Sequence, residues 1–404
     1  MLKLFNSLGR KMEVFRPVNR RLVTLFTCGP SVYQPSHIGN FRTFLFEDVL
    51  VRYLEYAGYT VRRGMNFTDI EDKAIEEAAR RRKTVGQIAG VNIRRFIAEM
   101  RSLRMKVPDY LPTASATVDE AASLVAELLR KGVAYRHGFH VYFDPLKFRG
   151  FGKLYGLDMR SWPVRKRRFH KDTYPGMRWN RGDFILWHGC DDPAVYCWQT
   201  EIGRGRPSWN VQDAGMVSRF LTETLSLYCG GIDNLIRHHD YSKAIIESVR
   251  PYPMARFWLH CNHLYVDGRK MSKSLGNIHY IGSLRRQGFR TGEIRFFLIY
   301  GHYRDRLIYS ARNMAAAAGR LRDFRARIRQ LQRKASPSSA AGRVATRLKD
   351  LFISHMDNDL DVRGAFDAVH AEIAATDIRR LSPQEAAGAI ACLREIDEVL
   401  QVLF

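Results

Sequence analysis

The stretch LFTCGPSVYQPSHIGNFRTFLF, residues 25–46, decides the fold and carries the first sign of a ligand site. Residues 22–26 form a short, β-branched apolar run, which predicts a buried strand. A Gly29–Pro30 breaker and a polar loop follow, and the apolar spacing of residues 41–58 predicts an amphipathic helix that ends at Gly58. The sequence therefore predicts a strand, a loop and the N-terminus of a helix, in that order.

Such a turn suits an anion, because free backbone N–H groups and the positive end of the helix dipole face the loop. His37 adds a side-chain donor, and Gly39 lets a phosphate or a base approach the backbone. Many strand-to-helix turns carry a histidine and a glycine without binding anything, so the turn alone is not specific. Support has to come from the rest of the chain.

Composition and charge limit the classes of protein that fit. The chain has 404 residues, of which 46% are hydrophobic, enough for large cores in two or three domains. It carries 65 Lys and Arg against 41 Asp and Glu, a net charge of +24. This excess favours a polyanion such as nucleic acid as partner, with an acidic membrane surface or a merely solubilising surface as alternatives. No apolar run approaches the roughly 20 residues of a membrane span, so we expect a soluble cytoplasmic protein.

The chain contains six cysteines, and none forms a CxxC pair. A chain of this size needs no disulfide framework, so reduced thiols are expected. The spacing does not favour a zinc ribbon, whereas a metal held by dispersed residues stays open.

The rest of the chain reads as an α/β protein with an insertion and a helical end. Residues 59–66 predict a second strand. Thr68 or Asp69 is expected to be the N-cap of the next helix, with Asp72 in its first turn. This alternation of strands and helices is typical of a parallel sheet. Residues 134–206 are rich in aromatic and basic residues and predict a β-rich insert, with four consecutive cations at 165–168. Helical and strand-like runs alternate again over residues 211–265, and helical patterns follow from residue 310.

The second chemical motif is KMSKS, residues 270–274. It follows a strand-like run at 264–266 and the turn Asp267–Gly268. Two lysines and two hydroxyls make a cationic loop suited to a pyrophosphate, whose charge is spread over several oxygens. Contacts that strengthen as this leaving group departs lower the barrier to its release.

HIGN at 37–40 together with KMSKS resembles the class I aminoacyl-tRNA synthetases, and the flanking text is similar to the cysteinyl-tRNA synthetase family. The matching blocks span residues 20–404 and include CGPSVYQPSHIGN, MNFTDIEDKAI, FILWH, GRPSWN, GGIDNLIRHH, ARFWLHCNHLYVDGRKMSKSLGN and GHYRDRLIYS. The resemblance implies a Rossmann-like parallel sheet split by a β-rich module and followed by a C-terminal α-helical bundle. We divide the chain into a first catalytic half at 1–115, the insert at 116–206, a second catalytic half at 207–309 and a helical tRNA-stem-contact bundle at 310–404.

The resemblance also implies where ATP binds. His37 and Asn40 would bracket the phosphates, with Asn40 standing where the family usually has a second histidine. An asparagine can donate a hydrogen bond but cannot carry a proton. Lys270 and Lys273 would hold the pyrophosphate. The remaining expected contacts to ATP and its Mg²⁺ come from Gly39, Gly231, Asp233, Met271, Ser272 and Ser274.

The implied reaction joins an amino acid to AMP and then to the terminal ribose of a tRNA. Cys28, Gly29, Thr68 and Trp209 match the amino-acid pocket, and cysteine is the expected substrate. We expect a monomer that contacts tRNA, in part through the strongly basic residues 314–334. The chain ends soon after the helices, so the anticodon-binding module of the family is expected to be missing.

Cysteine enzymes of this family are expected to hold a zinc ion through two cysteines, a histidine and a glutamate. A thiolate binds zinc far better than a hydroxyl does, which selects cysteine over serine. Cys28 and His238 stand at two of these positions, whereas Asp213 and Ser242 replace the second cysteine and the glutamate. An S/O/N triad could still bind zinc, and the alternative is a pocket without metal. Four nearby residues could compensate: His239, Asp240, Cys261 and His263.

Three functions remain open at this point. The first is a divergent cysteinyl-tRNA synthetase. The second is a paralogue that adenylates another amino acid or charges a different acceptor. The third is a non-catalytic RNA-binding protein on a synthetase scaffold, although exposed cations such as Lys270 and Lys273 have no packing reason to be kept.

Overall fold

The computed structural model describes residues 1–161, 183–192, 196–220, 223–271, 275–337 and 342–404. At its centre lies a four-stranded parallel sheet in the order β10-β9-β3-β4. The strands are β3 (Leu22–Thr27), β4 (Thr60–Met65), β9 (Leu225–Gly231) and β10 (Ala255–Cys261). The predicted parallel α/β core is confirmed. Because β3 pairs with β9, the segments on either side of the insert form one sheet, and their carboxyl ends meet at one edge.

Helix α1 (Ile38–Tyr56) crosses this sheet and is buried on most sides. It contacts β9 and β4 on one side and helices α8 (Thr291–Ile299) and α12 (Pro383–Leu400) on the other. The predicted helix is therefore present, but it begins three residues earlier and is a central element rather than an amphipathic surface helix. Gly58, two residues after its end, has φ +91° and reverses the chain.

The insert forms an antiparallel sheet in the order β5-β6-β7-β8. Its strands are β5 (Ala134–His137), β6 (His140–Phe143), β7 (Phe184–Gly189) and β8 (Gly205–Pro207). Helix α4 (Val118–Arg130) packs against α5 (Trp209–Phe220) and α6 (Asp240–Val249). The basic tetrad at 165–168 lies outside the described residues.

One pair of cysteines departs from the expectation of reduced thiols. Cys190 and Cys197 of the insert are joined by a disulfide, with their Cα atoms 6.6 Å apart. The other four cysteines are buried free thiols.

Further strands and helices complete the catalytic part. They are β1 (Lys3–Asn6), β2 (Lys11–Val14), α2 (Asp72–Arg80), α3 (Val85–Ser102), β11 (Leu264–Val266), β12 (Arg269–Lys270), α7 (Ile281–Arg286) and β13 (Leu307–Tyr309). The N-cap expected at Thr68 or Asp69 is wrong, since Glu71 precedes α2. The Asp69 carboxylate instead accepts hydrogen bonds from the backbone and hydroxyl of Ser115, which ties two loops together.

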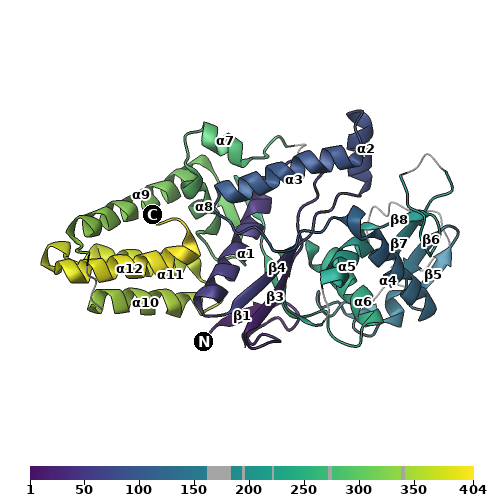
Figure 1. Cartoon of the computed structure of the whole chain (residues 1–404), viewed down its shortest axis with the longest axis horizontal. Coiled ribbons are helices and arrows are strands. Elements are labelled where there is room, and N and C mark those ends of the chain that lie inside the picture. Colours follow the sequence, from purple (N-terminus) through teal and green to yellow (C-terminus); the bar gives the residue numbers. More distant parts are fainter. Residues whose placement is uncertain (162–182, 193–195, 221–222, 272–274, 338–341) are drawn as a thin grey trace.

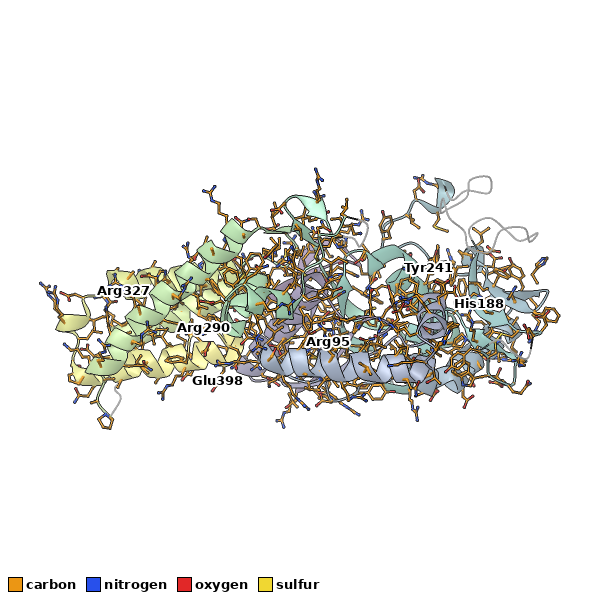
Figure 2. The ribbon with its side chains drawn as sticks, turned by 90° about the horizontal axis from the view of Figure 1, so that it is seen from above. Arg95, His188, Tyr241, Arg290, Arg327 and Glu398 are labelled. Carbon is orange, nitrogen blue, oxygen red and sulfur yellow. A yellow bond between two sulfur atoms is a disulfide. The ribbon has the colours of Figure 1, made fainter. Side chains whose placement is uncertain are left out.

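Four helices form the C-terminal bundle: α9 (Ala311–Lys334), α10 (Arg343–Met356), α11 (Val362–Ala375) and α12. Figure 1 shows the bundle at one end of the molecule, the insert at the other and the parallel sheet between them. In the second view, Arg327 on α9 and His188 on β7 mark these two ends (Figure 2). Within the described part of the chain, no helix combines the length and apolar character that a membrane crossing requires.

Candidate active site

A cavity of about 510 Å³ opens at the carboxyl ends of β3 and β9, above the N-terminus of α1. Parallel sheets bind their ligands at this edge. Eleven of the residues predicted for the site line this cavity: Cys28, Gly29, His37, Gly39, Asn40, Thr68, Trp209, Gly231, Asp233, Lys270 and Met271. Three others, Ser272, Lys273 and Ser274, lie outside the described residues.

His37 and Asn40 form a reciprocal cap at the start of α1. The backbone N–H of Asn40 donates to His37 Nδ1 at 3.3 Å, and the backbone N–H of His37 donates to Asn40 Oδ1 at 3.0 Å. Because Nδ1 accepts, the proton of the neutral imidazole sits on Nε2. Burial lowers the pKa of His37, so the ring is neutral at pH 7 and presents a fixed N–H donor.

Two glycines are required by close approaches within the cavity. A Cβ on Gly39 would lie 2.5 Å from Met271 Cε and 3.0 Å from His37 Nδ1. A Cβ on Gly231 would lie 2.6 Å from Asp233 Oδ1. Gly39 therefore lets the Met271 side chain approach the start of α1, and Gly231 leaves room for a carboxylate that can accept from hydroxyl groups.

The amino-acid side of the cavity is built from the loops after β3 and β4. Gly29 donates its N–H to Asn66 Oδ1 at 2.8 Å, and a Cβ on Gly29 would lie 1.8 Å from the Asn66 carbonyl oxygen. Ser31 and the buried Thr68 form an isolated parallel bridge. These contacts fix the loop that carries Cys28 to the end of β4.

Trp209, the first residue of α5, lies between the cavity and His238, a member of a buried polar cluster whose Cys28 also lines the cavity. Its ring stacks on the imidazole of His238, with ring centroids 4.3 Å apart and planes 13° apart. Trp209 remains 37% exposed, whereas His238 is only 1% exposed. The indole thus has one face against a buried imidazole and lines the wall of the cavity.

The buried cluster consists of Cys28, Asp213 and His238. One potential ligand atom of each lies within 4.8 Å of those of the other two. Asp213 Oδ1 and both ring nitrogens of His238 are buried and have no hydrogen-bond partner among the described residues. Burial, with the nearby Asp213 charge, raises the pKa of the Cys28 thiol. Unpartnered oxygen and nitrogen atoms beside a thiol fit a divalent metal such as zinc, because all three are zinc ligands.

Ser242, predicted at the position of a metal ligand, is not a member of this group. Its hydroxyl donates to Asp213 Oδ2 at 3.4 Å. The hydroxyl of Tyr228 donates to the same oxygen. Sequence reasoning missed Tyr228, because it lies within the apolar strand β9 and has the pattern of a core residue.

The structure describes all four compensating residues suggested by the sequence and places none of them in this group, although the ring centroid of His239 lies 5.7 Å from that of His238. His239 Nδ1 and His260 Nε2 share a hydrogen bond of 2.8 Å, and His260 Nδ1 shares one of 2.7 Å with the Ser7 hydroxyl. His263 lines the cavity. Asn234, which the sequence did not single out, donates from Nδ2 to Cys28 Sγ at 3.5 Å.

Comparisons with known proteins match this arrangement. Residues 14–319 match the family described as tRNA synthetases class I (C) catalytic domain. The whole chain is 34% identical to a cysteine–tRNA ligase of Chlamydia muridarum, covering 88% of that protein, and 34% identical to one of Koribacter versatilis, covering 82%. A cysteine–tRNA ligase of Chlamydia trachomatis serovar D is 35% identical, again over the whole chain.

Solved structures share the fold at low sequence identity. The LeuRS–tRNA–LeuAMS ternary complex of Agrobacterium radiobacter K84 superposes with a TM-score of 0.68 at 12% identity, over 96% of this chain and 85% of that one. Mycobacterium tuberculosis methionyl-tRNA synthetase with methionyl-adenylate gives 0.64 at 14% identity, over 95% and 90%.

Proposed function

Because the chain belongs to the cysteinyl-tRNA synthetase family of class I aminoacyl-tRNA ligases, we propose that it activates cysteine with ATP and transfers it to the 3′ end of a tRNA. The observation that carries the choice of cysteine is the group of Cys28, Asp213 and His238, buried beside the cavity where ATP would bind.

Activation forms a bond between a carboxylate oxygen of cysteine and the α-phosphorus of ATP, and it breaks the bond from that phosphorus to the pyrophosphate. Negative charge grows on the leaving group, and donors fixed beforehand stabilise it most effectively. We assign this role to His37 Nε2–H, to the positive end of the α1 helix dipole and to Lys270. The magnesium ion that accompanies ATP neutralises further phosphate charge.

Asn40 supports the same step in a different way from a histidine. Its Oδ1 is held by the His37 backbone, so its Nδ2 group is the part that can donate to a phosphate. It cannot carry a positive charge, and its contribution to the transition state is that of a neutral donor. Transfer then follows, as a terminal ribose hydroxyl of tRNA attacks the adenylate carbonyl and AMP leaves.

Selection of cysteine is assigned to the buried cluster. Cys28, Asp213 and His238 would hold a zinc ion, and bound zinc prefers a substrate thiolate to a hydroxyl. Trp209 orients His238 by stacking on it, and Asn234 donates to the sulfur of Cys28. With three ligands from the protein, such an ion would still be able to accept the substrate thiolate.

The proposal is tested by ATP–pyrophosphate exchange across all amino acids, followed by charging of total tRNA. Exchange with cysteine alone supports it. Exchange with a different amino acid supports a paralogue, which the replacement of a thiolate by Asp213 and of a glutamate by Ser242 would favour. If no amino acid supports exchange, the result would point to a non-catalytic RNA-binding protein.

A further inference from the structure

The carboxylate of Asp213 is held from two directions at one of its oxygens. Tyr228, on β9, and Ser242, on α6, both donate their hydroxyl groups to Oδ2. All three residues have no solvent exposure. Oδ1 accepts no hydrogen bond from the described residues, and His238 Nε2 lies 3.6 Å from Oδ2. One carboxylate oxygen is therefore anchored and the other is left with its lone pairs free.

The packing of Tyr228 explains its ring but not its hydroxyl. The ring stacks on Phe26, with centroids 5.9 Å apart, and meets His239 edge to face at 4.8 Å. A phenylalanine would make the same ring contacts. A buried hydroxyl is costly unless it is hydrogen-bonded, and the partner of this one is Asp213.

A carboxylate ligand needs this kind of support more than a thiolate does. A thiolate offers one sulfur atom, whereas an unrestrained carboxylate can rotate, bind through either oxygen or turn away. Partners that hydrogen-bond a ligating carboxylate fix its orientation and are worth about 10- to 100-fold in metal affinity.

We propose that Tyr228 and Ser242 are positioning residues that hold Asp213 as a fixed oxygen ligand in the place of a thiolate. The inference rests on the proposed metal site of Cys28, Asp213 and His238. It assigns Ser242 a new role: this residue stands where a ligand is expected but acts by orienting the ligand beside it. Asp213, Tyr228 and Ser242 then form one unit.

The test measures Zn²⁺ affinity of the full chain by competition with a chromophoric chelator. Tyr228→Phe should weaken zinc binding by about 10- to 100-fold, and Ser242→Ala by less, because its hydrogen bond is long. Tyr110→Phe is the matched control, because the buried Tyr110 hydroxyl has no partner among the described residues and its ring stacks on Phe220 in the same core. This control should bind zinc like the unaltered chain. Should Tyr228→Phe fail to fold, Ser242→Ala carries the test.

The same Tyr228→Phe substitution, made in an Asp213→Cys chain, distinguishes an effect on the orientation of Asp213 from an effect on core packing. In an Asp213→Cys chain the Tyr228 hydroxyl loses its carboxylate acceptor, so adding Tyr228→Phe should change zinc affinity by less than about 3-fold. A loss of the same size in both backgrounds would show a packing effect and overturn the inference. Equal affinities of Tyr228→Phe and the unaltered chain would overturn it too, and leave the proposed function intact. An unaltered chain that binds no zinc would overturn both the inference and the proposed metal site.

Discussion

Replacing Gly39 by alanine should impair the reaction with ATP while leaving the stability of the fold nearly unchanged. The added methyl would lie 2.5 Å from Met271 Cε and 3.0 Å from His37 Nδ1, whereas unstrained carbon contacts are about 3.5–4.0 Å. Met271 is flexible and can retreat by about 1 Å at little cost. His37 cannot move as freely, because its Nδ1 accepts the capping hydrogen bond from Asn40.

The two contributions to stability nearly cancel. Loss of the cap lowers the free energy of unfolding by about 1 kcal/mol, and alanine in place of glycine within a helix raises it by up to about 1 kcal/mol. The melting temperature should therefore change by no more than a few degrees. Catalysis is more sensitive, because a shift of about 1 Å in a positioning group can cost about 100-fold.

We therefore expect Gly39→Ala to lower kcat/KM for ATP in pyrophosphate exchange by about 100-fold and to leave zinc affinity unchanged. Gly86→Ala is the matched control. Gly86 is the second residue of α3, as Gly39 is of α1, and a Cβ there meets nothing within 4 Å. A Gly39→Ala chain with exchange within 2-fold of the unaltered chain would refute the role of this close approach.

Three further predictions concern the loop, the basic helix and the core. Lys270→Ala should lower the exchange rate by about 10- to 100-fold with an unchanged melting temperature, and an unchanged rate would remove its assignment to pyrophosphate. Arg329→Ala and Arg333→Ala, exposed on α9, should each reduce the slope of log tRNA affinity against log salt by about 1 and leave exchange intact; a slope equal to that of the unaltered chain would exclude these contacts. Burial raises the pKa of Glu47 from 4.5 to about 7 despite its ion pair with Arg63. Because the pKa of Glu47 is higher in the folded than in the unfolded chain, protonation of Glu47 favours the folded state. This contribution to the free energy of unfolding is fully present below pH 4.5 and is lost as the pH rises through 7, a change on the order of 3 kcal/mol. Urea unfolding of Glu47→Gln between pH 5 and 8 should show a smaller decline, and an equal decline would contradict this.

The sequence predicted which residues at the start of α1 line the cavity, because this part of the wall depends on local order. A strand, a loop and a helix N-terminus are adjacent in the chain, so His37, Gly39 and Asn40 follow from one stretch. Their reciprocal cap needed the structure, because it replaces the serine or aspartate that usually signals a helix start.

The metal side depends on register between distant segments. Tyr228 on β9 donates to Asp213 on α5, and no local pattern specifies this contact. Similarly, Asp69 has the sequence features of an N-cap, but the structure commits its carboxylate to Ser115. The disulfide between Cys190 and Cys197 was missed because a spacing of seven residues has no characteristic motif.

The central claim is that this chain selects cysteine by the chemistry of its thiol. The most direct test is the ratio of kcat/KM for cysteine to that for serine in ATP–pyrophosphate exchange by the zinc-loaded chain. A purely steric pocket separates such similar side chains by about 10- to 200-fold. Selection through bound zinc should give a ratio well above that range, and a ratio within it, or no exchange with cysteine, would contradict such selection.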